Sequence, residues 1–381
     1  MENRVKSAIR NIELSGIRRF NELAKSKENM IFFTIGEPYF NTPENVKRVG
    51  IEAIENNHTF YTQNQGSLAF REAVSRYVQE NYHLNYSSSE VIATVGSMEG
   101  LSTTLSTLIE PEDEVIIPTP CYPGYAPLIT MNGGKVVEMN TKQDDFQLSE
   151  QAILSHITPK TKAILITSPN NPSGCVYSKA SIEALLSCVK DREIFVISDE
   201  VYREIVYDAE KFVSIGEYES VREKVIIISG FSKSHSMTGW RVGYVLADSS
   251  IAKHILKTHQ YLVTSTCTIS QYAAIEALKT SNRDMIDHYL KNRNYGVKRV
   301  HEMGLDMVEA SGAFYFFICI EKFGISSVEF CTRLLENGVA CIPGEYFGEG
   351  FDDYIRLSYA CNFQDLQEGL DRFERFIETL K

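Results

Sequence analysis

The sequence has no long apolar run: its longest runs, such as residues 225–228, fall far short of the ~20 residues that span a bilayer. It also has no excess of positive charge, because 38 Lys and Arg stand against 50 Asp and Glu, a net charge of −12. Phosphate backbones and anionic membranes repel a chain this acidic, so neither is expected as a main partner. The first twenty residues carry frequent charges and no apolar core, so no signal peptide is expected.

The eight cysteines include no C-x-x-C pair, so no zinc site and no other metal site is expected. In a chain without a signal peptide they are predicted to be reduced thiols, mostly in the core, of a cytoplasmic protein. The sequence also lacks repeats, low-complexity tracts and linkers. Single cores stop growing near ~250–300 residues, so 381 residues predict one large domain and a smaller one.

Short segments rich in Val and Ile recur between residues 90 and 247 and alternate with helix-like stretches such as residues 178–190. They are apolar almost without interruption, which is typical of strands buried on both faces. The pattern predicts an α/β fold with a mostly parallel seven-stranded sheet and helices on both sides. Ligands of such sheets bind beyond the carboxyl ends of the strands. The expected strands are 91–96, 114–120, 135–140, 163–169, 194–200, 225–230 and 241–247.

After residue 285 the pattern changes to that of a smaller α+β unit, which ends in an amphipathic helix from Asp365. Other elements expected there are strands at 312–320 and 354–360 and a helix at 327–337. We therefore expect a large ligand-binding domain of residues 46–285 and a small domain of residues 286–381. Residues 1–45 are too few for a core of their own and are expected to pack with the small domain.

Lys233 lies between two expected strands, in a loop of small and polar residues, SGFSKSHSMTGWRVGY (229–244). A buried ammonium must be paired or neutralised, and a lysine that forms an imine with an aldehyde becomes part of a cofactor instead. Arg241, at the start of the next strand, offers a fork of donors to a phosphate, and Ser232 adds a hydroxyl. A lone lysine on a polar loop is usually a surface residue, so this interpretation depends on the other site residues.

Pyridoxal phosphate needs an imine lysine, a cradle for its dianion, an acid that keeps its pyridine nitrogen protonated, and a flat surface for its ring. Asp199 ends an apolar strand, where a buried carboxylate requires a cationic or hydrogen-bonding partner. Tyr202 follows three residues later and suits the phenolate oxygen of the ring. The cradle is expected at residues 95–99, where a strand turns into a helix from Gly100 to Leu108, because helix N-termini attract anions. An ordinary helix cap and an ordinary strand–helix turn are the alternatives.

Three further residues lie after strands or inside an apolar strand. Asn171, held extended before Pro172, offers its amide to the ring oxygen, and Tyr122 can stack on the ring. Arg356 occupies an apolar strand, YIRLSYA, where a guanidinium is costly unless it binds a carboxylate, such as the α-carboxylate of a substrate. The alternatives are an Asn-Pro turn, a core tyrosine and an internal salt bridge.

Together these residues resemble the class I aminotransferases, the fold-type I pyridoxal-phosphate enzymes, along the whole chain. The resemblance rests on SKSHSMTGWRVGY, Asn171-Pro172, Asp199-x-x-Tyr202 and Arg356, in the family's arrangement. The segments SGFSKSHSMTGWR, AKHILKTHQYLVTS, GAFY and IRLSYA are similar to the bacterial branch of aromatic amino acid aminotransferase and N-acetyl-LL-diaminopimelate aminotransferase.

The resemblance implies a role for each residue. Lys233 would be the catalytic residue, forming the Schiff base and moving a proton during the reaction. Pyridoxal phosphate would be held by Asp199 at the pyridine nitrogen, Asn171 and Tyr202 at the ring oxygen, Tyr122 on the ring, and Ser97, Met98, Ser232 and Arg241 at the phosphate. Arg356, Asn171 and the Gly36 backbone would bind the substrate α-carboxylate. Tyr61 would reach the phosphate of the other subunit, which implies a homodimer.

The implied reaction is a ping-pong transfer of an amino group from an L-amino acid, aromatic or N-acetyl-diaminopimelate-like, to a 2-oxo acid such as 2-oxoglutarate. Met98 stands where aspartate-using relatives often carry Lys, which disfavours aspartate. Tyr39 replaces an Asp near the substrate entrance, and Gly230 replaces a serine. The alternatives are a carbon–sulfur β-lyase with the same cofactor and a non-catalytic ligand sensor.

Overall fold

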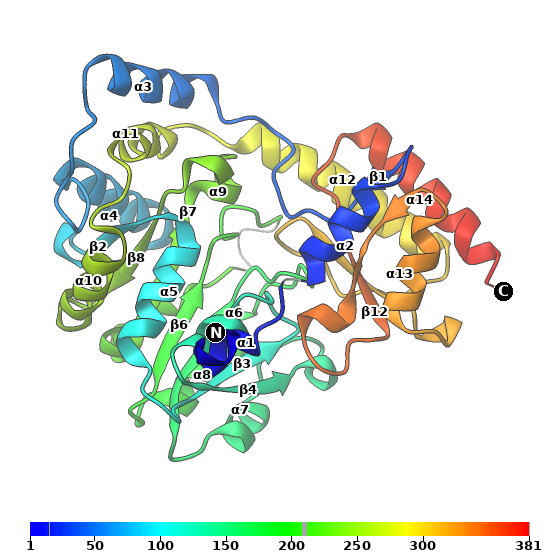
Figure 1. The fold of residues 1–381 in the computed structure, drawn as a ribbon, viewed down its shortest axis with the longest axis horizontal. Helices are drawn as coiled ribbons and strands as arrows, with labels where there is room; N and C mark the ends of the chain where they lie inside the picture. The colour runs from blue at the N-terminus through cyan, green and yellow to red at the C-terminus, as the bar shows by residue number, and fades with distance from the viewer. Residues whose placement is uncertain (15, 208–211, 381) are drawn as a thin grey trace.

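The computed structural model describes residues 1–14, 16–207 and 212–380. Its largest sheet has seven strands in the order β2-β8-β7-β6-β5-β3-β4 (Figure 1). Neighbouring strands are parallel except at β8, which is antiparallel to both β2 and β7. The predicted mostly parallel, seven-stranded α/β fold is therefore confirmed. The strands are β2 (Val91–Thr94), β3 (Glu114–Thr119), β4 (Lys135–Asn140), β5 (Thr161–Thr167), β6 (Phe195–Asp199), β7 (Val225–Gly230) and β8 (Gly243–Ala247).

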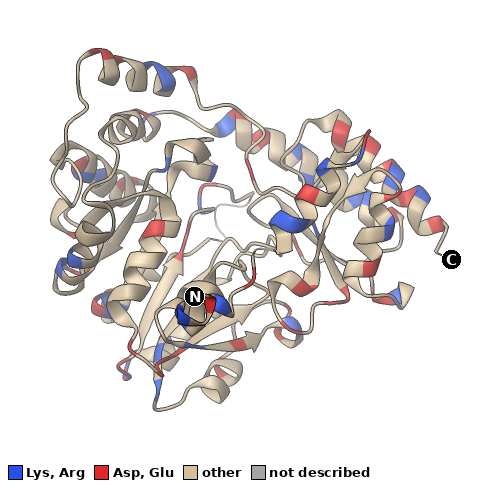
Figure 2. Cartoon of the chain, in the orientation of Figure 1, with Lys and Arg blue, Asp and Glu red and all other residues tan. Residues whose placement is uncertain are grey.

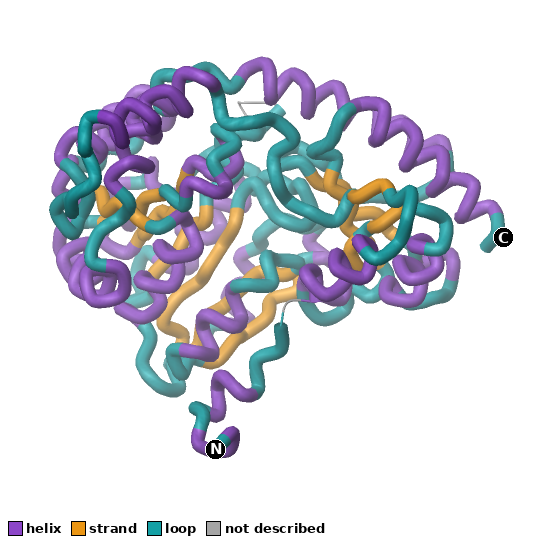
Figure 3. Tube along the Cα trace, turned by 45° about the horizontal axis from the view of Figure 1, so that its top comes forward, coloured by secondary structure: helices purple, strands orange, loops and turns teal. Residues whose placement is uncertain are grey.

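The strands are apolar without interruption because both faces of the sheet are covered. On β5, Ile164 and Ile166 join one hydrophobic cluster, while Ala163 and Leu165 join another. Side chains alternate between the two faces of a strand, so each cluster is the core on one face. Figure 3 shows the strands enclosed by helices, and Figure 2 shows the charged residues mainly on the outer helices and loops.

The helices of the large domain divide between these two clusters. Leu105 of α5 and Ile255 of α10 belong to one cluster, whereas Val74 of α4 and Leu185 of α8 belong to the other. The helix α5 begins at Gly96, so the sequence-based start at Gly100 was wrong by one turn. The helices from α3 to α11 are α3 (Glu44–Glu55), α4 (Leu68–Tyr82), α5 (Gly96–Leu108), α6 (Tyr125–Met131), α7 (Glu150–His156), α8 (Lys179–Val189), α9 (Phe231–Ser234), α10 (Ser249–Val263) and α11 (Thr268–Ala277).

A second unit holds a three-stranded antiparallel sheet in the order β11-β12-β9. Its helices and sheet share a third hydrophobic cluster rich in phenylalanine, including Phe316, Phe330 and Phe373. Figure 1 shows this unit beside the large sheet, with α12 leading into it. Its elements are α12 (Arg283–Glu302), β9 (Tyr315–Cys319), α13 (Ser327–Leu335), β10 (Val339–Ala340), β11 (Ile342–Pro343), β12 (Tyr354–Ser358) and α14 (Phe363–Glu378).

The N-terminal segment contacts both units. The short helix α1 (Ser7–Arg10) lies near α6, where Lys6 donates a hydrogen bond to the Met131 carbonyl. By contrast, Phe20 on α2 (Gly16–Lys25) packs in the cluster of the small unit. The strand β1 (Ile31–Phe32) pairs in parallel with β10 of that unit. The proposed domain limits at residues 45 and 285 stay predictions.

All eight cysteines are free thiols and five of them are buried, in agreement with the expectation of reduced thiols that lie mostly in the core. Across the described ranges, no helix combines the length and the apolar character needed to cross a bilayer.

Candidate active site

Lys233 follows the carboxyl end of β7 and is half-buried. It lies in the four-residue helix α9, so the expectation of a loop at this position was wrong. The backbone at Gly230 runs against that of Gly243, where a Cβ would meet the neighbouring Cα at 3.1 Å. The Lys233 ammonium donates a hydrogen bond to the Gly36 carbonyl. Burial lowers the pKa of Lys233 to about 8, and Glu37 partly opposes this. The amine is thus much easier to deprotonate than an ordinary lysine.

Asp199 ends β6 and is only 5% exposed. Its Oδ2 accepts a hydrogen bond from the Tyr125 hydroxyl at 2.8 Å, and its Oδ1 accepts one from the Val201 N–H at 3.2 Å. Burial raises its pKa to about 6, although these two hydrogen bonds and Lys233 lower it. Among the described residues, no cation lies within ion-pair distance of this carboxylate. The site therefore holds a buried acid that a ligand cation, such as a protonated ring nitrogen, would satisfy.

The N-terminus of α5 meets Arg241 at the same point. No side chain caps this helix, and Gly96 has φ +74°, where an added Cβ would lie 2.4 Å from Arg241 Nη2. Arg241 precedes β8 by two residues instead of opening it, which corrects the prediction, and its own φ is +52°. Its guanidinium donates to the Thr238 carbonyl at 2.9 Å. A helix dipole and a guanidinium together form a binding site for a dianion such as phosphate.

Arg356, in the middle of β12, is 2% exposed. It donates to Asn171 Oδ1 at 2.9 Å and to the Thr34 carbonyl. Its guanidinium lies 4.6 Å from the ring centroid of Tyr315 and 5.0 Å from that of Phe347. Burial lowers its pKa, and no carboxylate of the described residues pairs with it. The predicted alternative of an internal salt bridge is therefore wrong within this part of the chain, and a ligand carboxylate fits the unpaired cation.

Aromatic side chains complete the walls. The Tyr202 and Tyr315 hydroxyls are 2.6 Å apart, and Tyr122 packs edge-on against Tyr125 with ring centroids 5.5 Å apart. A Cβ on Gly36 would lie 1.9 Å from the Tyr315 hydroxyl, so only glycine fits there. Sequence reasoning missed Tyr125 and Tyr315 as site residues. The only available signals were the position of Tyr125 three residues after Tyr122 and of Tyr315 in the GAFY segment.

These side chains line one cavity of about 440 Å³. Ten of the predicted positions besides Lys233 belong to its wall: Gly36, Ser97, Met98, Tyr122, Asn171, Asp199, Tyr202, Ser232, Arg241 and Arg356. Tyr61 does not, because its side chain is 84% exposed and lines a separate hollow with Phe60, Cys267 and Thr268. The cavity lies where elements of the large sheet, α2 and the small unit meet.

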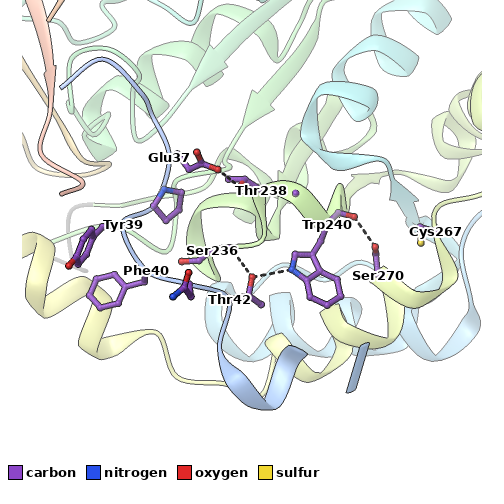
Figure 4. A pocket seen from close by; sticks show the side chains of 12 residues that line it. Glu37, Tyr39, Phe40, Thr42, Ser236, Thr238, Trp240, Cys267 and Ser270 are labelled. Atoms are coloured by element: carbon purple, nitrogen blue, oxygen red, sulfur yellow. Dashed lines mark hydrogen bonds between the residues drawn. The ribbon is translucent and has the colours of Figure 1, made fainter. Parts of the chain in front are cut away.

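In a neighbouring pocket, hydrogen bonds connect the segment before α3 to the segment that follows Lys233 (Figure 4). Thr42 donates a hydrogen bond to the Ser236 carbonyl at 2.6 Å and accepts one from Trp240 Nε1 at 3.0 Å. The Thr238 hydroxyl donates to Glu37 at 2.6 Å. Tyr39, expected near the substrate entrance, lines this pocket and stacks on His288 with ring centroids 5.5 Å apart. It is not part of the wall of the cavity.

The cavity fits pyridoxal phosphate on the strength of its donor set. It offers an amine of lowered pKa, an anion site at a helix N-terminus, and a buried carboxylate with no cation of the described residues beside it. A fold-type I sheet with this arrangement defines the chain as a pyridoxal-phosphate enzyme.

Comparison with known proteins specifies the class further. The profile of the family described as "Aminotransferase class I and II" matches residues 28–373. A probable N-acetyl-LL-diaminopimelate aminotransferase of Bacillus subtilis is 43% identical over 99% of this chain and 96% of its own length. Aromatic-amino-acid aminotransferase 2 of Thermococcus litoralis is 36% identical over 96% of each chain. The solved aspartate aminotransferase of Thermotoga maritima superposes with a TM-score of 0.94 at 36% identity, over 98% of this chain and 100% of that one.

The chain therefore belongs to the class I and II aminotransferases. It is a transaminase that uses pyridoxal phosphate and takes an amino acid and a 2-oxo acid as substrates.

Proposed function

We propose that Lys233 bonds the cofactor and moves the substrate proton, and that Arg356 with Asn171 binds the substrate α-carboxylate. The observation that carries this proposal is that the Lys233 amine and the unpaired Arg356 guanidinium line one cavity, with Asp199 buried in the same wall. When bound, the cofactor supplies an aldehyde that accepts the amino group and a ring that withdraws electrons from the substrate Cα.

Each side chain then has a defined task. The Lys233 amine, with a pKa of about 8, would take the proton from the substrate Cα and later return it. Asp199 would hold the proton at the pyridine nitrogen, and Tyr202 and Asn171 would hydrogen-bond the ring oxygen. The phosphate would be held by Arg241, Ser232 and the first turn of α5, with Ser97 and Met98. Tyr122 would pack against the ring.

For the amino donor, we infer an aromatic or N-acetyl-diaminopimelate-like amino acid, transferred to a 2-oxo acid such as 2-oxoglutarate. The names of two relatives support this inference, as does the presence of Met98 instead of a lysine in the cavity wall. A homodimer and a cytoplasmic location also belong to the proposal. The exposure of Tyr61, at 84%, agrees with a role across a subunit interface. If the protein sedimented as a monomer at assay concentrations, the proposed role of Tyr61 in the active site of the other subunit would be refuted.

The test of the proposal is the variant Lys233→Ala. After treatment with borohydride and peptide mapping, the native protein should carry the cofactor at position 233, and the variant should carry none and lose turnover. A panel of amino donors with 2-oxoglutarate then measures the preference. Release of a 2-oxo acid supports transamination, whereas pyruvate with ammonia from a cysteine conjugate supports the β-lyase alternative. Normal turnover by Lys233→Ala would overturn the assignment.

A further inference from the structure

The wall of the cavity contains one cation to which the proposed function assigns no partner. Among the described residues of the wall, the cationic side chains are Lys233, Arg241, Arg356 and Arg18, and the only carboxylate is that of Asp199. In the proposed function, the phosphate dianion of the cofactor would be bound by Arg241 and the helix N-terminus, a substrate α-carboxylate would be bound by Arg356, and Lys233 would be bonded to the cofactor. Arg18 is left without an assigned partner, in a chain whose net charge is −12.

Arg18 lies on α2, and one face of that helix forms part of the wall. Ile17, Arg18 and Asn21 line the cavity, and residues three apart on a helix lie on the same face. Arg18 and its neighbour Arg19 are both exposed, but Arg19 is not part of the wall. For Arg18, no hydrogen bond or ion pair to another described residue is found. Its guanidinium is thus free to bind a ligand at the mouth of the cavity.

The face of α2 is connected to the site of the α-carboxylate. The Thr34 hydroxyl donates a hydrogen bond to Asn21 Oδ1 at 2.7 Å, and the Thr34 carbonyl accepts from Arg356. One residue thus fixes the position of α2 relative to the buried arginine. Arg18 also acts electrostatically on Tyr122, the residue proposed to pack on the cofactor ring. Burial raises the pKa of the Tyr122 phenol, and the positive charges of Arg18, Arg356 and Arg241 oppose that rise.

We propose that Arg18 is a specificity residue that binds the distal carboxylate of a dicarboxylic substrate, such as the side-chain carboxylate of 2-oxoglutarate, while Arg356 binds the carboxylate beside the reacting carbon. This inference rests on the proposed function for the place of the α-carboxylate. An arginine suits the task because its planar fork of donors binds a carboxylate through two hydrogen bonds. The face of a guanidinium also accepts an aromatic ring, so Arg18 does not exclude aromatic donors.

The test compares two ligands of equal chain length on the pyridoxal-phosphate-loaded enzyme by calorimetry. 2-Oxoglutarate has a distal carboxylate, and 2-oxopentanoate has a methyl group in its place. Arg18→Gln should weaken binding of 2-oxoglutarate about tenfold, the effect of one charge-assisted hydrogen bond, and leave 2-oxopentanoate unchanged. Arg19→Gln is the matched control and should leave both affinities unchanged. Arg18→Lys should restore part of the difference, because it keeps the charge but not the planar fork.

Three results would overturn the inference. Native enzyme that binds both ligands equally has no site for the distal carboxylate. Equal weakening of both ligands in Arg18→Gln would indicate a structural role of α2, and an equal effect of Arg19→Gln would indicate a general field effect. Because the measurement is of binding, it stands apart from the proposed function. If the protein bound 2-oxoglutarate selectively through Arg18 but did not transaminate, only the proposed function would be refuted.

Discussion

The variant Arg356→Met is expected to abolish most activity without destabilising the protein. Arg356 is 2% exposed and is held only by neutral oxygens, those of Asn171 and Thr34. Replacing buried charged groups by apolar residues of similar size is often neutral or stabilising, by about 1–4 kcal/mol for an ion pair or triad, because the desolvation penalty disappears. Methionine adapts to irregular space between rings such as those of Tyr315 and Phe347. The lost hydrogen bonds to Asn171 Oδ1 and the Thr34 carbonyl act in the opposite direction, by about 1–3 kcal/mol together.

The two effects nearly cancel, so the free energy of unfolding of the apo-protein should change by less than about 2 kcal/mol. Activity should respond far more strongly. Removing one partner of a buried, hydrogen-bonded charge pair costs about 3 kcal/mol or more, which corresponds to a fall in kcat/KM of about 150-fold or more. The fall should be the same for every amino donor, since all of them share the α-carboxylate.

The assays are urea unfolding of the apo-protein and steady-state kinetics of the loaded enzyme, with cofactor content measured after dialysis. Cofactor content should be unchanged, because Arg356 is assigned to the substrate and not to the phosphate. Arg19→Met, an exposed arginine outside the wall of the cavity, is the control. The reasoning is refuted if Arg356→Met keeps its kcat/KM, or if it loses the cofactor and its stability together.

Two further predictions concern ionisation. Tyr125→Phe removes the 2.8 Å hydrogen bond that lowers the pKa of Asp199, now about 6, and should raise that pKa by about one unit. Only the ionised carboxylate pairs with a protonated pyridine nitrogen, so cofactor affinity should fall as the pH drops through this pKa. The midpoint of this fall in affinity should lie about one pH unit higher in the variant than in the native protein. Equal midpoints would contradict the assignment. Lys233 reacts with the cofactor aldehyde only as the free amine, and its pKa is lowered to about 8. The rate of cofactor uptake by the apo-protein should therefore rise with pH and level off above about pH 8, whereas a rise that continues to pH 10 would indicate an ordinary, exposed lysine.

The positions of the strands were predictable because a strand that is buried on both faces of a parallel sheet is a nearly continuous run of apolar residues in the sequence. All seven strands occur within about two residues of the predicted limits. The errors lie at the turns. The helix α5 starts one turn earlier than predicted because Gly96, at φ +74°, lets the chain bend directly into it. Lys233 lies in a helix of one turn, and four residues are too few to show a helical periodicity in the sequence.

The separate chemical groups of the site were also readable. A lysine, an aspartate or an arginine that follows or interrupts an apolar strand is costly there, and that cost marks it as unusual in any sequence. Tyr125 and Tyr315 carry no such mark. Both are large aromatic side chains in apolar surroundings, and their hydroxyl hydrogen bonds to Asp199 and Tyr202 are visible only in three dimensions.

The sequence by itself determined the class of fold and the kind of chemistry. The fold class follows from the local pattern of buried apolar residues, and the chemistry follows from charged residues at positions where burying a charge is costly. Only the tertiary structure decided which of these charges meet. It joins Arg356 to Asn171 across 185 residues, turns Arg18 rather than Arg19 towards the cavity, and leaves Tyr61 on the surface. These outcomes depend on how separate units pack and on where each side chain points, which no local pattern of residues encodes.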